Sequence, residues 1–113
     1  MTDKIIVYTT CSNPQEAEKV AARLLEKKLA ACVSFTPGAT SVYRWKGVVE
    51  QSVEVTITIK SRRDLLEKLM VELRKVHPYE IPEILAVPVV AGWPPYLDWM
   101  DAELPAQPIG SEG

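Results

Sequence analysis

Residues 40–60 read TSVYRWKGVVEQSVEVTITIK, and this stretch decides the fold class. From Val53 to Lys60, apolar and polar side chains alternate, which is the period-2 pattern of a β-strand with one buried face. Thr40 to Trp45 is rich in threonine, valine and aromatic residues, and Lys46-Gly47 between the two runs suits a tight turn. The stretch therefore predicts a long β-hairpin.

The first strand of this hairpin extends towards the N-terminus with one interruption. Cys32 to Phe35 already has β character. Pro37-Gly38 follows, and a proline and a glycine within a strand pattern predict a bulge or a bend. We expect the strand to resume at Thr40.

A helix is predicted before the hairpin. Asn13 is suited to the N-cap, Pro14 to the first helical position, and Glu16 to the third. An apolar face follows at helical spacing, and it consists of Ala17, Val20, Ala21, Leu24 and Leu25.

A second helix is predicted after the hairpin. Ser61 to Asp64 has the S-x-x-D form of a capping box. His77-Pro78 ends this helix, because the residue before a proline is disfavoured in the α region. The apolar stripe between these limits is Leu66, Leu69, Met70 and Leu73.

Two further strands, one before the first helix and one after the second, complete the pattern. Ile5 to Thr9 is a short apolar run, and Ile84 to Val87 is predicted as a last core strand. Pro88 permits an edge position for that strand but not a central one. The element order β-α-β-β-α-β predicts an α+β, ferredoxin-like sandwich with an extended hairpin.

The C-terminal part is expected to add little to this sandwich. A turn at Trp93-Pro94-Pro95 precedes a short terminal helix that includes Tyr96 and Trp99. We predict one domain over residues 1–104. Residues 105–113, in which proline, glycine and serine are frequent, are predicted to form a flexible tail.

One face of the predicted sheet lacks a partner. Right-handed crossovers place both helices on the same face of the sheet. The opposite face must meet water or another surface, and Tyr43 and Trp45 are large exposed candidates on the long hairpin. An apolar patch of that kind marks an association surface, so we expect a homo-oligomer.

Composition and charge exclude several classes of protein. The chain has 113 residues, is 47% hydrophobic and carries a formal net charge of -2, which fits one globular domain. A weakly acidic domain is a poor phosphate binder, so we expect no nucleic-acid partner. No apolar run approaches the length of a membrane span and no signal peptide is visible, so the expected location is the cytoplasm, without membrane association.

The small number of potential metal ligands limits the kinds of metal site that the chain can form. One histidine and two cysteines are too few for a closed zinc site of Cys and His within one chain. His77 is the central candidate ligand, with the thiols of Cys11 and Cys32 and the carboxylates of Glu80 or Glu83 as partners. The alternative is that His77 only ends its helix, where an imidazole interacts favourably with the helix dipole.

Enzyme signatures are missing from the sequence. It contains no G-x-S-x-G, no P-loop and no H-E-x-x-H. We therefore expect that the protein is not an enzyme and that it has no obligatory cofactor.

Two strings resemble the CutA divalent-cation tolerance proteins. They are the run from Pro37 to Gly47, of the form PG-x-TS-x-Y-x-W-x-G, and HPYE-x-PE from His77 to Glu83. The resemblance runs from about Ile5 to Trp99. It implies a ferredoxin-like fold, similar to the PII signalling proteins, and a tight homotrimer in which extended hairpins join neighbouring subunits.

The resemblance also implies a function. It links the chain to divalent-metal tolerance and to the binding of copper or other divalent cations in a metal response. Copper-binding members carry a cysteine after the first strand, where Cys11 lies, and a His-His pair before the proline, where Val76 precedes His77 here. The alternative is a PII-like signalling or scaffold protein that binds a small ligand or a protein partner at intersubunit clefts.

A second group of residues is the candidate for such a cleft or for subunit contacts. Aromatic residues dominate interfaces but also stack small ligands. Lys60 either meets a carboxylate or phosphate of a ligand or is solvated and paired with Glu54 on the same strand face. The whole group is Tyr43, Trp45, Glu54, Lys60, Tyr79, Tyr96 and Trp99.

Overall fold

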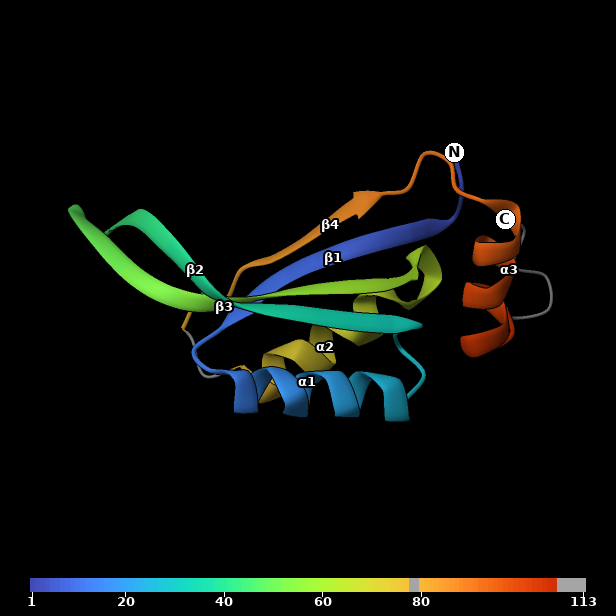
Figure 1. Cartoon of the computed structure of the whole chain (residues 1–113), viewed down its shortest axis with the longest axis horizontal. Coiled ribbons are helices and arrows are strands. Elements are labelled where there is room, and N and C mark those ends of the chain that lie inside the picture. Colours follow the sequence, from blue (N-terminus) through green and yellow to red (C-terminus); the bar gives the residue numbers. More distant parts are fainter. Residues whose placement is uncertain (78–79, 108–113) are drawn as a thin grey trace.

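The computed structural model describes residues 1–77 and 80–107, and these form an α+β sandwich (Figure 1). The element order confirms the predicted ferredoxin-like plan, with an added C-terminal helix. The elements are β1 (Lys4–Cys11), α1 (Pro14–Glu26), β2 (Cys32–Trp45), β3 (Val48–Arg62), the 3₁₀ turn η1 (Arg63–Leu65), α2 (Leu66–Val76), β4 (Ile84–Pro88) and α3 (Pro94–Glu103).

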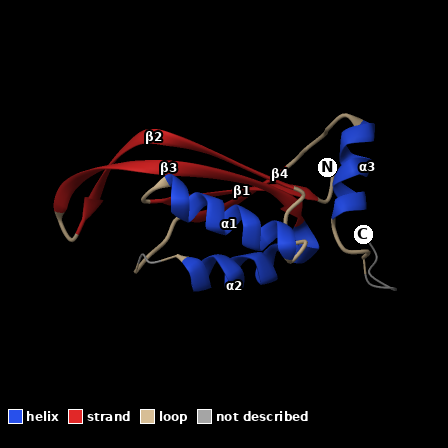
Figure 2. Ribbon diagram, turned by 60° about the horizontal axis from the view of Figure 1, so that its bottom comes forward, coloured by secondary structure: helices blue, strands red, loops and turns tan. Residues whose placement is uncertain are grey.

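The four strands form one antiparallel sheet in the order β2-β3-β1-β4. Helices α1 and α2 lie side by side on one face of it (Figure 2). Val7, Ile57 and Ile59 point from the sheet into the core, and Leu24 and Leu69 meet them from the helices. Burial of these side chains between the two layers is the main source of stability.

The hairpin is longer than the rest of the sheet. Its ladder runs from Cys32 opposite Lys60 to Trp45 opposite Val48, whereas β1 reaches along β3 only as far as Val55. The far half of the hairpin therefore projects beyond the core, and the chain is 48 Å long in this direction (Figure 1).

The two predicted irregularities of the hairpin are confirmed. The register shifts between Thr36 and Ala39, where Gly38 adopts a φ of 90°, as a bulge at Pro37-Gly38 requires. The turn occupies Lys46 and Gly47, with φ of 50° and 81°. Two successive left-handed residues match the twist of the strands that they connect.

The predicted start of α1 is also confirmed. The Asn13 side chain accepts a hydrogen bond from the Glu16 amide at 2.9 Å, and the Glu16 carboxylate accepts one from the Ser12 amide at 2.9 Å. Ala17, Val20 and Leu24 are buried as expected. Leu25 is exposed, so its assignment to the buried face was wrong.

The predicted capping box at Ser61–Asp64 is wrong. Ser61 belongs to β3, where it pairs with Ile5, and its hydroxyl donates to the Leu29 carbonyl at 2.7 Å. The Asp64 carboxylate accepts from the guanidinium of Arg62 at 2.6 and 3.1 Å. The ladder with β1 keeps this segment extended, so η1 separates the strand from α2, which begins at Leu66.

Strand β4 is an edge strand, as Pro88 indicated, because it pairs with β1 only. The prediction that this strand lies in the core is wrong for the single chain. Leu85 and Val87 are exposed, since they share the face of Tyr8 and Ile6, which the helices do not cover. This uncovered face, the open face of the sheet, is where the sequence placed an association surface.

Helix α3 is fastened to the end of the sheet by charges. Arg62 is only 2% exposed, and it donates to Asp101 at 3.1 Å and to the Pro105 carbonyl at 2.6 Å. The buried Lys4 ammonium also reaches Asp101, at 3.1 Å. Asp101 thus bridges two buried cations, and the chain remains attached to the domain at Pro105, past the predicted boundary at residue 104.

We predict that Asp101→Asn lowers the free energy of unfolding by about 1–3 kcal/mol, because it leaves Lys4 and Arg62 with one anionic partner fewer. Urea unfolding at fixed protein concentration measures this loss. Asp98→Asn, which removes an exposed carboxylate from the same helix, is the matched control. Equal stability of the two variants would contradict the bridging role.

Candidate functional site

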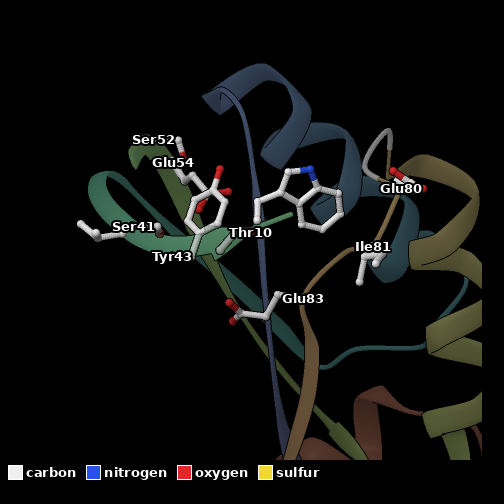
Figure 3. A pocket seen from close by; sticks show the side chains of 10 residues that line it. Thr10, Ser41, Tyr43, Ser52, Glu54, Glu80, Ile81 and Glu83 are labelled. Atoms are coloured by element: carbon white, nitrogen blue, oxygen red, sulfur yellow. The ribbon is translucent and has the colours of Figure 1, made fainter. Parts of the chain in front are cut away.

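A cavity of about 690 Å³ lies between the projecting hairpin and the segment that leads into β4 (Figure 3). We call it the hairpin cavity. Its lining residues come from β1, from both strands of the hairpin and from the segment before β4. They are Thr10, Ser41, Val42, Tyr43, Trp45, Ser52, Glu54, Glu80, Ile81 and Glu83.

The strand register explains why the hairpin contributes these residues. Ser41 lies opposite Ser52, and Ala39 lies opposite Glu54. Directly opposed residues of an antiparallel pair share a face, and every second residue returns to it. Tyr43, two positions beyond Ser41, therefore reaches the same cavity.

The electrostatic character of the hairpin cavity is negative. Glu54, Glu80 and Glu83 contribute three carboxylates, and no lysine, arginine or histidine is among the described residues that line it. Figure 3 shows Glu54 and Glu80 on opposite sides of the cavity, with Glu83 apart from both. The arrangement favours a ligand with separated positive charges over an anion.

His77 and Cys11, the first two predicted metal ligands, are brought to the same end of the sheet. The His77 imidazole Nε2 lies 2.5 Å from the carbonyl oxygen of Thr10, the residue before Cys11. Thr10 also lines the hairpin cavity, which places Glu83 in the same region. The C-terminal end of α2, where His77 lies, is thus beside the end of β1, a point that the sequence left open.

The Cys11 thiol is held in its protonated form. It is 2% exposed and donates to the Asn13 carbonyl at 3.3 Å. Burial raises the pKa of Cys11, because it disfavours the thiolate. A metal that binds here must displace this proton.

Cys32 lies elsewhere. It pairs with Lys60, whereas Cys11 pairs with Val55, so five ladder positions, or about 17 Å, separate the two cysteines along the sheet. Within residues 1–77 and 80–107, no three His, Cys, Asp or Glu side chains gather as a metal site. One chain therefore brings His77 and Cys11 together without Cys32.

The described residues that were predicted to form a cleft or subunit contacts lie at two opposite ends of the sheet. Tyr43, Trp45 and Glu54 line the hairpin cavity, whereas Lys60 donates to the Tyr96 hydroxyl at 3.2 Å at the opposite end of the sheet. There Tyr96 packs against Trp99 with ring centroids 5.4 Å apart, and Tyr79 lies outside the described residues.

The proposed pairing of Lys60 with Glu54 is wrong. Six positions along β3 separate the two residues by about 20 Å. Hydrogen bonding to the Tyr96 hydroxyl is the main cause that raises the pKa of Lys60. Lys60 is therefore committed to α3 and does not supply a positive charge to the hairpin cavity.

Sequence reasoning missed several lining residues. Thr10, Ser41 and Ser52 are small polar residues in strands, and such residues give no local signal of a site. Ile81 reaches the cavity through the loop after α2, which no periodic pattern describes. The signals that did point to this region were the predicted cleft residues Tyr43, Trp45 and Glu54, and the proximity of Glu80 and Glu83 to His77 in the chain.

Comparison with known proteins gives a consistent result. The family model described as "CutA1 divalent ion tolerance protein" matches residues 5–103. Protein CutA of Mus musculus is 45% identical over 93 residues, which are 82% of this chain and 52% of that protein. The chain thus spans about half the length of this mammalian relative. Divalent-cation tolerance protein CutA of Yersinia pestis (strain Pestoides F) is 42% identical over 91% of this chain and 87% of its own.

Solved structures show the same similarity. CutA from Xylella fastidiosa superimposes with a TM-score of 0.89 at 36% identity, and the match covers 92% of this chain and all of the other. A CutA from Archaeoglobus fulgidus, described as periplasmic, gives 0.86 at 37% identity over 88% of this chain and 97% of its own. None of the helices in the described ranges has the length and apolar character to cross a bilayer.

We predict that Cys11 in a Cys32→Ser background is alkylated by iodoacetamide with a pH midpoint above that of an ordinary thiol, about 8.5. Burial is the reason, since it raises the pKa of Cys11. The rate measured against pH gives the midpoint, and Cys11→Ser, which keeps Cys32, is the matched control. A Cys11 midpoint below the ordinary value would contradict this description of the site.

Proposed function

This chain belongs to the CutA1 divalent ion tolerance protein family, and we propose that it acts as a homotrimer that binds copper or another divalent metal ion in a metal response. The observation that carries the metal part is the contact of His77 with the end of β1, next to Cys11. The role is one of binding and not of catalysis, and it needs no resident cofactor.

The open face of the sheet supports the assembly. Tyr8, Leu85 and Val87 leave apolar surface exposed there, on the face opposite α1 and α2. Beyond the core, Val53 is 68% exposed on the projecting hairpin. A hairpin alone is marginally stable in water, and exposed apolar surface of this kind favours association. Sister subunits supply the missing cover in the proposed trimer.

Copper fits the chemistry of the proposed ligands. Imidazole suits copper and zinc, and a thiolate suits the soft Cu(I) ion. His77 and Cys11 supply these two groups, and Glu83 lies in the adjoining hairpin cavity. We propose that the remaining ligands are water or come from a neighbouring subunit, which is the route by which Cys32 would join the site.

The cytoplasm is the proposed compartment. Both cysteines are free thiols, and the roughly 17 Å between their ladder positions prevents a bond within one chain. Reduced cysteines suit a reducing compartment. The periplasmic description of the Archaeoglobus fulgidus protein applies to that relative.

A second candidate function is a PII-like sensor or scaffold that takes up a small ligand. The hairpin cavity favours it, because 690 Å³ lies within the range of about 300–1,000 Å³ that is common for ligand pockets. Its aromatic walls and separated polar groups also match such pockets.

We predict that Cys11→Ser and His77→Ala each weaken Cu(I) binding by about tenfold or more, because each removes a proposed ligand. Titration against a chromogenic Cu(I) chelator measures the affinity. For the unaltered protein the affinity rises with pH below the thiol pKa, by up to about tenfold per unit, since binding releases the Cys11 proton. Unchanged affinity in both variants would remove this pair from the site, and Cys32→Ser tests whether a second thiol takes part.

We predict a solution mass of three 12.6-kDa chains by light scattering at micromolar concentration. Leu85→Lys places a charge on the open face and is expected to reduce the mass towards one chain. Val71→Lys, at an exposed apolar position on α2, is the matched control and is expected to remain trimeric. A single-chain mass for the unaltered protein would overturn the assembly.

A further inference from the structure

We propose that a groove on the helical face of the domain docks an acidic segment of a partner protein that carries an apolar side chain. The groove has a volume of about 520 Å³ and lies between the C-terminal end of α1 and the first turns of α2. This inference goes beyond the metal and small-ligand functions and depends on neither of them. The residues that line the groove are Lys27, Leu29, Glu67, Lys68, Val71 and Glu72.

The position of the groove separates it from the proposed subunit contacts. Helices α1 and α2 cover one face of the sheet, and the open face lies on the other side (Figure 2). An assembly through the open face and the projecting hairpin therefore does not cover the groove. The helical face remains available to a different partner.

One buried carboxylate holds the cations beside the groove in place. The Glu72 side chain is only 9% exposed, and it accepts a hydrogen bond from the Arg23 guanidinium at 2.7 Å. It also lies 3.5 Å from the Lys27 ammonium and 3.4 Å from the Lys75 ammonium. Hydrogen bonding to Arg23 is the main cause that lowers the pKa of Glu72 to about 2, so this carboxylate is ionised at neutral pH. The three cations are thus ordered before any partner arrives, which reduces the entropy cost of binding.

These cations keep hydrogen-bond donors for a partner. The side chains of Arg23, Lys27 and Lys75 are 42%, 44% and 57% exposed, and each has more N–H groups than its contact with one carboxylate occupies. Lys68 adds a fourth positive charge, whereas Glu67 is the only further carboxylate in the described lining. The local excess of positive charge, in a chain with a formal net charge of -2, favours an acidic partner.

The apolar part of the groove favours a peptide over other polyanions. Val71 is 54% exposed although charged side chains surround it, and Leu29 lines the groove beside it. An apolar side chain that enters a pocket within a charged rim is the common arrangement at protein interfaces. The phosphate backbone of a nucleic acid offers no such side chain, whereas a protein segment offers both carboxylates and an apolar anchor.

Fluorescence anisotropy with the unaltered, full-length protein tests the class of partner. The probe is a labelled synthetic peptide of aspartate and glutamate residues around a central Leu-Phe pair. We expect saturable binding that weakens by about tenfold when Gly-Ser replaces this pair, because the apolar contact is lost. We expect duplex DNA and phosphatidylserine vesicles to bind more weakly at the same ionic strength. Lack of saturable peptide binding, equal affinity for the two peptides, or tighter binding of DNA or vesicles would overturn the proposal.

Paired variants test the location at about 0.15 M salt, where screening limits distant charge effects to about 8 Å. We expect Lys27→Gln/Lys68→Gln to weaken binding of the Leu-Phe peptide by about tenfold and Val71→Ser by about fivefold. The control Lys19→Gln/Arg74→Gln removes the same charge from exposed helical positions outside the groove lining and is expected to stay within about twofold. Circular dichroism and light scattering verify that each variant folds and keeps its mass. Equal effects of the two charge pairs would show diffuse attraction and overturn the proposal.

Discussion

The antiparallel ladder between β2 and β3 is the interaction on which both the packed core and the hairpin cavity depend. In its first half, from Cys32 opposite Lys60 to Thr36 opposite Thr56, the ladder lies beside β1 and forms the core with α1 and α2. In its second half, it leaves the core and forms one wall of the hairpin cavity. Alternation of side chains along one continuous strand therefore connects the packing of the domain with its candidate site.

Different interactions determine the structure at the two ends of the sheet. At one end, buried Lys4 and Arg62 attract Asp101, and the buried side chains of Met100 and Leu104 add apolar packing that holds α3. At the other end, carboxylates gather without basic residues among the described lining. Charge is thus compensated within the chain at the end that α3 closes, whereas the hairpin cavity at the other end is lined by acidic side chains.

Local sequence patterns predicted most of the fold. The alternation in β3, the cap at Asn13 and the turn at Lys46-Gly47 each depend on residues within a few positions, so they can be read directly. The capping box at Ser61 failed because the same residues fit the end of a strand, and pairing with β1 decided between the two. The buried state of Arg62 gave no signal, since two of its partners, Asp101 and Pro105, lie far along the chain.

The candidate site was only partly predictable for the same reason. His77 and Cys11 were named, but their approach depends on the packing of the C-terminal end of α2 beside the end of β1. Glu54 and Lys60 share a strand face and were taken as partners, although the length of the strand separates them. The sequence identifies chemical types well, whereas tertiary structure decides which of them meet.

We propose that sister subunits cover the projecting hairpin and the open face of the sheet. Hydrogen exchange of the amides in residues 40–52, followed as the protein is diluted, tests it directly. We expect slow exchange at micromolar concentration and a cooperative loss of protection when the mass falls to one chain. Hairpin amides that exchange as fast as those of an unstructured peptide at all concentrations would contradict it.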